Sequence, residues 1–338
     1  MATLKDVAKL AHVDVSTVSR ALNNTSYVHP DTKQRIFDAV KQLSYHPNVL
    51  AQGLRQGKRH TIGLIVPRLM PSIFGNISQG VETAALKYNY GTLICNTGDN
   101  PATEQEILTR LRDGFVDGII IAGTGANNRI VKDIHASGIP VIQVIRQPIA
   151  SLSSVTADYR TIGYNAVQYL YRKGCRTIGI IESANTSVPY LERYEGYHKA
   201  MNELDLREVI LRNDVSQNNI HYGYDCMISS LMNHDACDGI LAASDAQGIG
   251  VFRALKERHI RVPEDIKVLS LTGYQMGEML ETSLTSMELP STEIGVKSFL
   301  MLLEAINAKN AEAKGAPKYV PQHLSFPAEL VERESTAS

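Results

Sequence analysis

The chain lacks the long apolar segments that a membrane protein needs. In its 338 residues, no uninterrupted apolar run approaches the ~20 residues that span a bilayer. The first residues, MATLKDVAKLAHVDV, carry an early acid at Asp6 and no continuous apolar stretch, so we expect no secretory signal. A hydrophobic fraction of 43% is still enough to bury sizeable cores, which excludes a wholly disordered chain.

Cysteine is scarce and metal-binding patterns are missing. The four cysteines are scattered with no C-x-x-C pair, which argues against a zinc site or a disulfide framework and predicts a cytoplasmic, reducing location. The ten histidines show no metal-ligand spacing, so we predict no metal and no cofactor. The cysteines are Cys95, Cys175, Cys226 and Cys237.

Common catalytic motifs are also missing. The segment G-T-G-A-N-N at 123–128 follows a predicted strand, but it lacks the third glycine of a dinucleotide-binding fingerprint. The chain has no phosphate-binding loop of the G-x-x-x-x-G-K-[ST] type, no G-x-S-x-G and no H-E-x-x-H. We therefore expect a protein that is not an enzyme.

The near-zero net charge conceals two oppositely charged parts. The whole chain carries 34 Lys+Arg and 35 Asp+Glu, for a net charge of −1. Residues 1–60 hold nine basic and four acidic side chains, so their net charge is +5, and residues 61–338 carry −6. A basic N-terminal part supplies the attraction to phosphates that DNA binding requires.

The first 45 residues have the pattern of three short helices. Apolar residues recur at three and four positions from Leu4 to Ala11, and Asp14 is a good N-cap for a second helix from Val15 to about Leu22. Pro30 suits the first turn of a third helix. Two short helices with a tight turn and a supporting third are the helix-turn-helix plan. The alternative, a helical cap on the following domain, is disfavoured by the polar, hydroxyl-rich face of the second helix.

From His60 onward, strands alternate with amphipathic helices, which predicts an α/β core with parallel, doubly wound sheets. Nine strands are many for one open sheet, so we expect two similar lobes. The predicted strands are Thr61–Val66, Gly91–Asn96, Gly118–Ala122, Pro140–Ile145, Ser154–Ala157, Thr177–Glu182, Gly239–Ala243, Lys267–Leu271 and Thr285–Glu288.

Several segments together resemble the LacI/GalR (lactose-repressor/galactose-repressor) family of bacterial transcription regulators. T-L-K-D-V-A, V-S-T-V-S-R-A-L-N and S-Y-H-P-N with A-Q-G-L-R are similar to its N-terminal signature. The resemblance continues through I-G-L-I-V-P (62–67), V-D-G-I-I (116–120), A-S-D (243–245) and V-P-E-D-I-K-V (262–268). I-V-P-R-L (65–69) and S-Q-G-V-E (78–82) resemble regulators of sucrose-type genes, which favours a disaccharide effector.

The resemblance implies three functional parts. These are a helix-turn-helix domain at 1–46, a hinge helix and linker at 47–59, and a core at 60–338 that resembles periplasmic sugar-binding proteins, with three connections between its lobes. The expected N-lobe comprises about 60–157 and 287–320, and the expected C-lobe about 158–286 and 321–338.

In the family, the second helix lies in the major groove and a hinge leucine enters the minor groove. Val15, Ser16 and Arg20 match base-reading positions, and a leucine wedge such as Leu54 kinks DNA. A lone leucine is otherwise usually a core residue. The full set of expected DNA contacts is Thr3, Val15, Ser16, Thr17, Ser19, Arg20, Asn23, Asn48, Ala51 and Leu54.

The family binds its effector in the cleft between the lobes. Arginine, aspartate and an aromatic ring suit a sugar, because they offer polar partners for hydroxyls and a surface for stacking. As alternatives, Asp245 caps the helix that follows it, or Arg146 pairs with a carboxylate at the lobe interface. Matching positions give Arg68, Phe74, Arg146, Asp158, Arg193, Ser244, Asp245 and Thr272 as the expected effector contacts.

Four positions, in three segments of the chain, depart from the family pattern. His12 stands in the first turn where glycine is usual, which strains the backbone if φ is positive there. Gly53 stands in the hinge where larger residues are usual, which weakens a helix. Thr272 and Gly273 stand where the family often has aspartate, so the effector of a well-known member does not transfer.

We therefore predict a repressor of carbohydrate-utilisation genes that binds double-stranded, pseudo-palindromic operator DNA as a homodimer and responds to a sugar or sugar-phosphate effector. The C-terminal V-E-R-E-S-T-A-S contains no leucine-rich helix of the kind that makes some family members tetramers. The alternatives are a sugar-binding receptor, which needs an export signal, and a sugar-modifying enzyme on the same scaffold, which needs a paired acid and base in the cleft.

Overall fold

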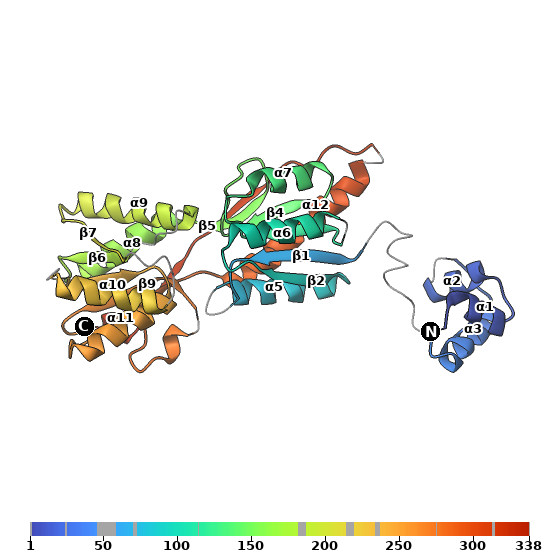
Figure 1. The fold of residues 1–338 in the computed structure, drawn as a ribbon, viewed down its shortest axis with the longest axis horizontal. Helices are drawn as coiled ribbons and strands as arrows, with labels where there is room; N and C mark the ends of the chain where they lie inside the picture. The colour runs from blue at the N-terminus through green and yellow to red at the C-terminus, as the bar shows by residue number, and fades with distance from the viewer. Residues whose placement is uncertain are drawn as a thin grey trace. The chain divides into compact units, whose positions relative to one another are not determined.

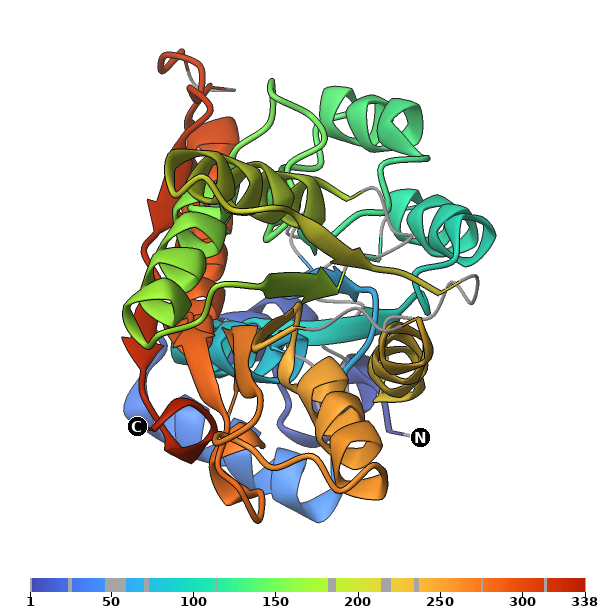
Figure 2. The ribbon, with the colours of Figure 1, turned by 90° about the vertical axis from the view of Figure 1, so that its left-hand side faces the viewer.

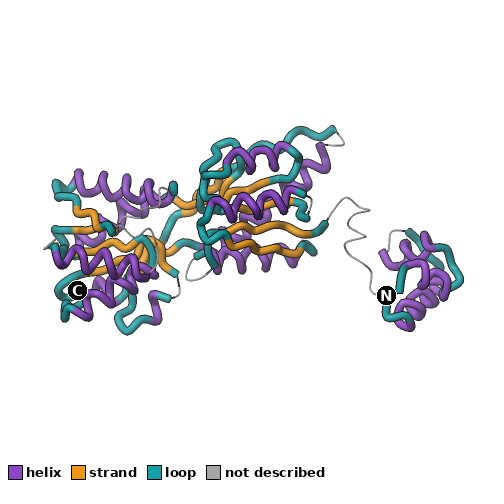
Figure 3. Tube along the Cα trace, viewed as in Figure 1, coloured by secondary structure: helices purple, strands orange, loops and turns teal. Residues whose placement is uncertain are grey.

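The computed structural model describes residues 2–23, 26–45, 59–69, 73–113, 115–181, 187–213, 220–233, 237–274, 276–312 and 315–337. They belong to two compact units, Met1–Arg59 and His60–Ser338, which we call the head and the core. Helices alternate with strands throughout the core (Figure 3). None of the described helices combines the length and the apolar composition that a bilayer crossing requires.

The elements follow the order of the chain as labelled in Figure 1. The α-helices are α1 (Leu4–Leu10), α2 (Val15–Asn23), α3 (Pro30–Gln42), α5 (Phe74–Lys87), α6 (Pro101–Arg112), α7 (Asn128–Ala136), α8 (Tyr159–Arg172), α9 (Val188–Glu203), α10 (Ile220–Met232), α11 (Asp245–Glu257) and α12 (Ser291–Glu312). The strands are β1 (Thr61–Val66), β2 (Gly91–Asn96), β3 (Gly118–Ile121), β4 (Val141–Val144), β5 (Ser154–Ala157), β6 (Ile178–Ile181), β7 (Val209–Leu211), β8 (Gly239–Ala242), β9 (Lys267–Gly273), β10 (Thr285–Glu288), β11 (His323–Phe326) and β12 (Glu329–Val331). Two 3₁₀ turns, η1 (Gly277–Met279) and η2 (Glu334–Thr336), complete the core.

The head is the predicted helix-turn-helix. The side chain of Asp14 accepts a hydrogen bond from the backbone N–H of Ser16 at 2.7 Å, as an N-cap does, and α2 begins at the next residue after Asp14. The turn that precedes it places His12 at a φ of 53°, so the strained left-handed residue expected there is present. The helices enclose a small apolar core of Val7, Ala8, Ala11, Val18, Ala21, Ile36 and Ala39.

The core contains two six-stranded sheets in the described part of the chain, in agreement with the predicted pair of α/β lobes. The N-lobe sheet has the order β11-β5-β4-β3-β1-β2 and is parallel throughout. The C-lobe sheet has the order β12-β10-β9-β8-β6-β7, and only β12 runs antiparallel to its neighbour. Helices cover both faces of the C-lobe sheet (Figure 2).

Burial on both faces explains the continuous apolar strands. In β1, Leu64 belongs to the apolar cluster under α5 and α12, whereas Ile65 belongs to the cluster on the opposite face with Leu108 of α6 and Val131 of α7. Neighbouring residues of a strand point to opposite faces, so both must be apolar where helices cover both sides.

The chain passes between the lobes three times, as predicted: after β5, after β10 and after β11. The expected lobe boundaries need correction at the last two passages. β11 (His323–Phe326) pairs with β5 of the N-lobe sheet, although 321–338 were assigned to the C-lobe. Met287 and Glu288 belong to β10 of the C-lobe sheet, although 287–320 were assigned to the N-lobe. Backbone pairing decides these memberships: β11 is a short edge strand on β5, and β10 lies between β9 and β12. The pairing partner of a strand leaves little trace in the strand's own side-chain pattern.

Helices α8 and α9 of the C-lobe touch backbone to backbone. A Cβ atom on Gly163 would lie 2.1 Å from the carbonyl oxygen of Arg193, and one on Gly196 would lie 2.0 Å from that of Arg160. Only glycine permits this approach at either position, and the contact fixes the part of α9 that carries Arg193.

Candidate functional site

The head presents one face of α2 to solvent. Val18 and Ala21 are buried in the apolar cluster inside the head, and their burial fixes which face of α2 points to solvent. On the other side Ser16 and Arg20 are exposed, and Val15, Thr17 and Ser19 are half-buried. These are the residue types that can contact base edges and phosphates in a major groove.

The other expected DNA contacts differ in their placement. Thr3 is the N-cap of α1, where its hydroxyl donates to Oδ2 of Asp6 at 2.7 Å and its backbone N–H donates to the same oxygen at 2.8 Å. Asn23 ends α2, but its side chain is outside the described residues. The hinge residues Asn48, Ala51, Gly53 and Leu54 also lie outside the described residues.

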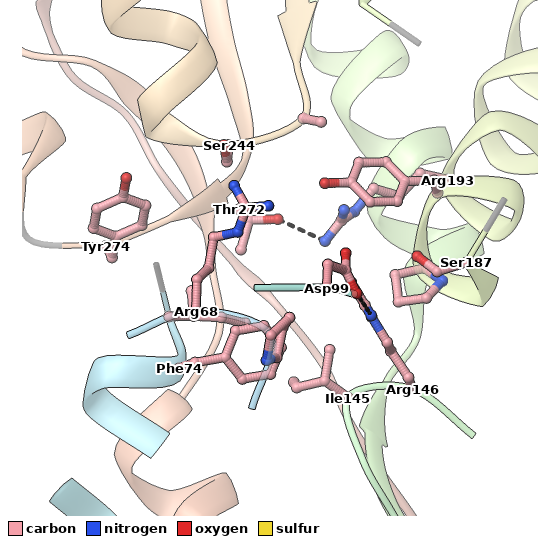
Figure 4. A pocket seen from close by; sticks show the side chains of 15 residues that line it. Arg68, Phe74, Asp99, Ile145, Arg146, Ser187, Arg193, Ser244, Thr272 and Tyr274 are labelled. Atoms are coloured by element: carbon pink, nitrogen blue, oxygen red, sulfur yellow. Dashed lines mark hydrogen bonds and ion pairs between the residues drawn. The ribbon is translucent and has the colours of Figure 1, made fainter. Parts of the chain in front are cut away.

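The core contains a cavity lined by both lobes (Figure 4). Its walls come from the carboxyl ends of β1, β4, β8 and β9 and from helices α5 and α9, which is where open α/β sheets place ligands. It brings together six of the expected effector contacts, namely Arg68, Phe74, Arg146, Arg193, Ser244 and Thr272. The lining residues that sequence reasoning missed are Pro67, Ile73, Asp99, Ile145, Ser187, Pro189, Tyr190, Ala243 and Tyr274.

A strained turn directs Arg146 into the cavity. Ile145 has a φ of 65°, which is rare for a β-branched residue, and the N–H of Arg146 donates to the carbonyl of Val144 at 2.6 Å across it. This γ-turn bends the chain sharply after β4. Strain of this kind persists where the surrounding structure holds it, and it concentrates at ligand sites.

Arg146 forms a two-pronged ion pair with Asp99. The two guanidinium nitrogens donate to Oδ1 and Oδ2 of Asp99 at 2.6 and 2.9 Å. Arg146 therefore pairs with a carboxylate, which was the alternative to its role as an effector contact. Burial disfavours the charged guanidinium, but the hydrogen bonds to Asp99 outweigh it and raise the pKa of Arg146.

Asp99 was missed because it lies in a turn and not at a strand end. Gly98 and Asp99 both adopt positive φ, at 61° and 60°, and Asn100 then caps α6 by accepting from the N–H groups of Ala102 and Thr103. The segment T-G-D-N is a turn pattern that could have drawn notice to this residue.

Arg193 is buried beneath aromatic rings. The residue is 5% exposed, and one guanidinium nitrogen donates to Oγ1 of Thr272 at 2.5 Å. The guanidinium carbon lies 4.7 Å from the ring centroid of Tyr159 and 5.8 Å from that of Tyr190. Burial lowers the pKa of Arg193, and the nearby tyrosines partly oppose this effect. Thr272, which stands where the family often has aspartate, is thus a neutral partner for this cation.

Asp158 and Asp245 do not line the cavity, contrary to the expectation for both. Asp158 is the N-cap of α8 and accepts from the N–H and hydroxyl of Thr161 at 3.0 and 2.6 Å. Asp245 is fully buried at the start of α11, and its Oδ2 accepts from the backbone N–H groups of Tyr274 and Gly277 at 2.8 and 3.3 Å. Both carboxylates are engaged by hydrogen bonds from their own lobe, Asp158 from Thr161 and Asp245 from two backbone N–H groups.

Comparison with known proteins accounts for both units. Residues 59–322 match the family of periplasmic binding proteins and sugar binding domain of LacI family, and residues 3–48 match the bacterial regulatory proteins of the lacI family. The HTH-type transcriptional regulator RegA of Clostridium saccharobutylicum is 30% identical over 342 residues, which cover 99% of this chain and 100% of that protein.

Solved structures agree on the fold. The lac repressor dimer bound to operator and the anti-inducer ONPF is similar with a TM-score of 0.86 and 22% identity, over 100% of this chain and 99% of that one. A LacI family transcriptional regulator from Enterococcus faecium with bound ribose has a TM-score of 0.72 and 26% identity, over 82% of this chain and 98% of that one. With a helix-turn-helix head, a two-lobed core and both family domains in one chain, this protein belongs to the LacI family of DNA-binding bacterial transcription regulators.

Proposed function

We propose that this protein is a cytoplasmic repressor of carbohydrate-utilisation genes that binds operator DNA as a homodimer. Binding of a sugar effector changes its affinity for the operator. The observation that carries the proposal is one chain with a polar, exposed α2 face on a basic head and an arginine- and tyrosine-lined cavity in its core. One three-helix head reads one half-site, so a pseudo-palindromic operator requires two chains.

The effector acts by shifting a population between two arrangements of the lobes. A ligand that contacts Phe74 of the N-lobe and Arg193 of the C-lobe at once favours the arrangement in which both contacts are made. Operator affinity then changes because the two arrangements bind DNA with different affinity. The coupling is reciprocal, so operator DNA changes the affinity for the effector by the same factor. The choice of a disaccharide of the sucrose type remains a prediction.

A binding role without catalysis is supported by the chemistry of the cavity and of the G-T-G-A-N-N loop. Sugar hydrolysis uses two carboxyl groups, whereas Asp99 is the one acidic residue among the described lining residues. Within the loop, Thr124 donates from its N–H and hydroxyl to the buried carboxylate of Glu104 at 2.7 and 2.8 Å, and Asn127 donates to it at 2.9 Å. This loop therefore holds a carboxylate of its own chain.

The DNA-reading role can be tested with an operator obtained by selection from random duplexes. Arg20→Ala should weaken operator binding by about 1–3 kcal/mol if Arg20 contacts a base edge. Arg35→Ala removes an arginine of α3 that is also exposed and is the matched control. Equal effects of the two substitutions, measured by fluorescence anisotropy, would contradict the assignment of α2 as the reading helix.

The sugar response can be tested by following the same complex while sugars are added. At least one mono- or disaccharide, or its phosphate, should change operator affinity and raise the melting temperature of the protein. A ligand at 100 times its dissociation constant stabilises the fold by about 2.7 kcal/mol. If no member of a broad sugar panel affects either quantity, the sugar effector is wrong.

A further inference from the structure

The cavity carries an excess of positive charge. Three arginines line it, Arg68, Arg146 and Arg193, against the single carboxylate of Asp99 among the described lining residues. Both oxygens of Asp99 already accept hydrogen bonds from Arg146. The carboxylate of Asp99 is therefore largely engaged before any ligand arrives.

Arg193 is buried without a carboxylate partner among the described residues. Within the described part of the chain, its one hydrogen bond runs to the neutral hydroxyl of Thr272, and its buried Nε has no hydrogen-bond partner. Removing a cation from water is unfavourable unless an anion and further acceptors replace the lost hydration. Arg146 has such a partner in Asp99, whereas Arg193 has aromatic faces and one hydroxyl.

The charges of all three arginines act on one lining side chain, that of Tyr190. Burial raises the pKa of Tyr190, and the charges of Arg193, Arg146 and Arg68 all oppose that rise. The hydroxyl of Tyr190 therefore lies in the positive field of all three. In Figure 4, Arg68 extends from the N-lobe toward the C-lobe residues Ser244 and Thr272, and Arg193 points toward Thr272 from α9.

A neutral sugar would suit this lining poorly. Each sugar hydroxyl must donate its proton to an acceptor, and carboxylates are the strongest acceptors that a protein offers. Guanidinium groups can only donate, so they favour a ligand rich in acceptor oxygens. Phosphate and carboxylate groups are rich in such oxygens, and two of these oxygens can accept the two parallel N–H groups of one guanidinium.

From the charge and burial of these residues, we infer that the effector is an anionic sugar whose phosphate or carboxylate group lies against Arg193. This inference rests on the proposed sugar-responsive function and narrows the effector class. The sugar ring lies between the aromatic side chains of Phe74 and Tyr190, and its hydroxyls reach Ser244 and Thr272. Asp99 holds Arg146 in place as part of the wall.

The test is isothermal titration of the full-length protein with matched neutral and anionic sugars. The pairs are glucose with glucose 6-phosphate, ribose with ribose 5-phosphate, and sucrose and trehalose with their 6-phosphates. Gluconate and glucuronate separate carboxylate from phosphate, and inorganic phosphate reports the anion alone. The anionic member of at least one pair should bind about tenfold or more tightly than its neutral parent, because each charge-assisted hydrogen bond contributes substantially to binding.

Three variants connect the preference to Arg193. Arg193→Gln should reduce the affinity for the anionic sugar to that of the neutral parent while operator binding is retained. Arg193→Lys keeps the charge but not the planar fork, so its affinity should be intermediate. Arg160→Gln is the control, because Arg160 on α8 is exposed, pairs with Glu195 and does not line the cavity. Retained operator binding and an unchanged circular dichroism spectrum establish that each variant is folded.

The outcomes separate this inference from the proposed function. If a neutral sugar binds as tightly as its anionic partner and changes operator affinity, the anionic effector is wrong and the repressor function stands. If inorganic phosphate or an anionic sugar binds equally well to Arg193→Gln, the anion does not lie against Arg193 and the inference also fails. If no sugar binds while operator is bound normally, the sugar effector itself is wrong, and the inference fails with it.

Discussion

At the scale of single residues, Asp245 is the carboxyl group whose charge the fold opposes most clearly. It is fully buried, and its Oδ1 makes no hydrogen bond with the described residues. Burial raises the pKa of Asp245 to about 6 from an ordinary value of 3.8, although the N–H of Tyr274 donates to Oδ2 and opposes the rise. The folded protein therefore holds this proton over a range of pH in which the unfolded chain has released it.

This raised pKa makes stability depend on pH. Because the folded state binds the proton more tightly, the stabilising contribution is present below about pH 4 and is lost as pH rises toward about 6. Asp245→Asn should therefore raise the free energy of unfolding of the core at pH 7.5 by about 3 kcal/mol, at 1.36 kcal/mol for each unit of pKa. Denaturant unfolding at pH 4.5 and 7.5 measures the effect.

A matched carboxylate provides the control for Asp245. Asp158 also stands at a helix start, where it caps α8, and asparagine is an equally good N-cap. Asp158→Asn should therefore change unfolding little at pH 7.5. If the substitution at Asp245 destabilises the core at this pH, burial of its carboxylate is not the unfavourable contribution that the geometry indicates.

At the scale of elements, the contact between α8 and α9 connects packing to the cavity. Gly163→Ala would place a Cβ atom 2.1 Å from the carbonyl oxygen of Arg193, so α9 must move away. Overpacking of this kind costs about 1–3 kcal/mol. Because Arg193 lies at the contact, the same shift should weaken effector binding several-fold. Thermal unfolding and titration with the effector measure the two effects.

Helices α5 and α12 of the N-lobe offer a control with the same geometry. A Cβ atom on Gly80 would lie 2.1 Å from the carbonyl oxygen of Thr292, away from Arg193. Gly80→Ala should destabilise the protein to a similar extent and weaken effector binding less than Gly163→Ala does. Equal losses of effector affinity would show that overpacking acts through general destabilisation and not through the position of Arg193.

The elements also show which strands a sequence pattern can reveal. All nine predicted strands are present, since runs such as Gly118–Ile121 are apolar and buried on both faces. β7, β11 and β12 were missed because they are three or four residues long and lie at sheet edges. Edge strands are held mainly by the backbone of one neighbour, so their side chains need no apolar alternation.

At the scale of the whole molecule, the distribution of charge follows the functions of the two units, DNA binding by the head and effector binding by the core. Residues 1–60 carry +5, and the remaining residues carry −6. The basic part attracts DNA phosphates, and the acidic part repels them, so the charge favours contact through the head. The net charge of −1 is a cancellation between these two parts.

Two heads acting together should make operator binding depend on both half-sites. A duplex with two half-sites should bind two chains, and removal of one half-site should weaken binding by about 10²- to 10⁴-fold, because the second contact is then no longer intramolecular. The slope of log affinity against log salt should fall by about half, since half of the phosphate contacts are lost. Equal affinity for one and two half-sites, in gel-shift assays with sedimentation analysis, would contradict the dimer.

Local pattern in the sequence determined the helices of the head, the alternation of strands and helices and the charge division, and the resemblance to the LacI/GalR family indicated six residues of the cavity. N-caps, helical periodicity and apolar runs depend on neighbours within a few residues, so one sequence is enough to identify them. Arg68, Arg146 and Ser244 match effector-contact positions of the family, and they follow buried strands, whose carboxyl ends meet at one edge of a sheet.

Tertiary structure alone decided which of these groups act together. Asp99 and Arg146 are 47 residues apart, and their ion pair depends on a left-handed turn at Asp99 and a strained turn at Ile145. Asp158 and Asp245 also stand close to strand ends, but their carboxylates accept hydrogen bonds from backbone N–H groups and do not line the cavity. The direction of a side chain depends on the backbone and the partners that surround it after folding, and these come from distant parts of the chain.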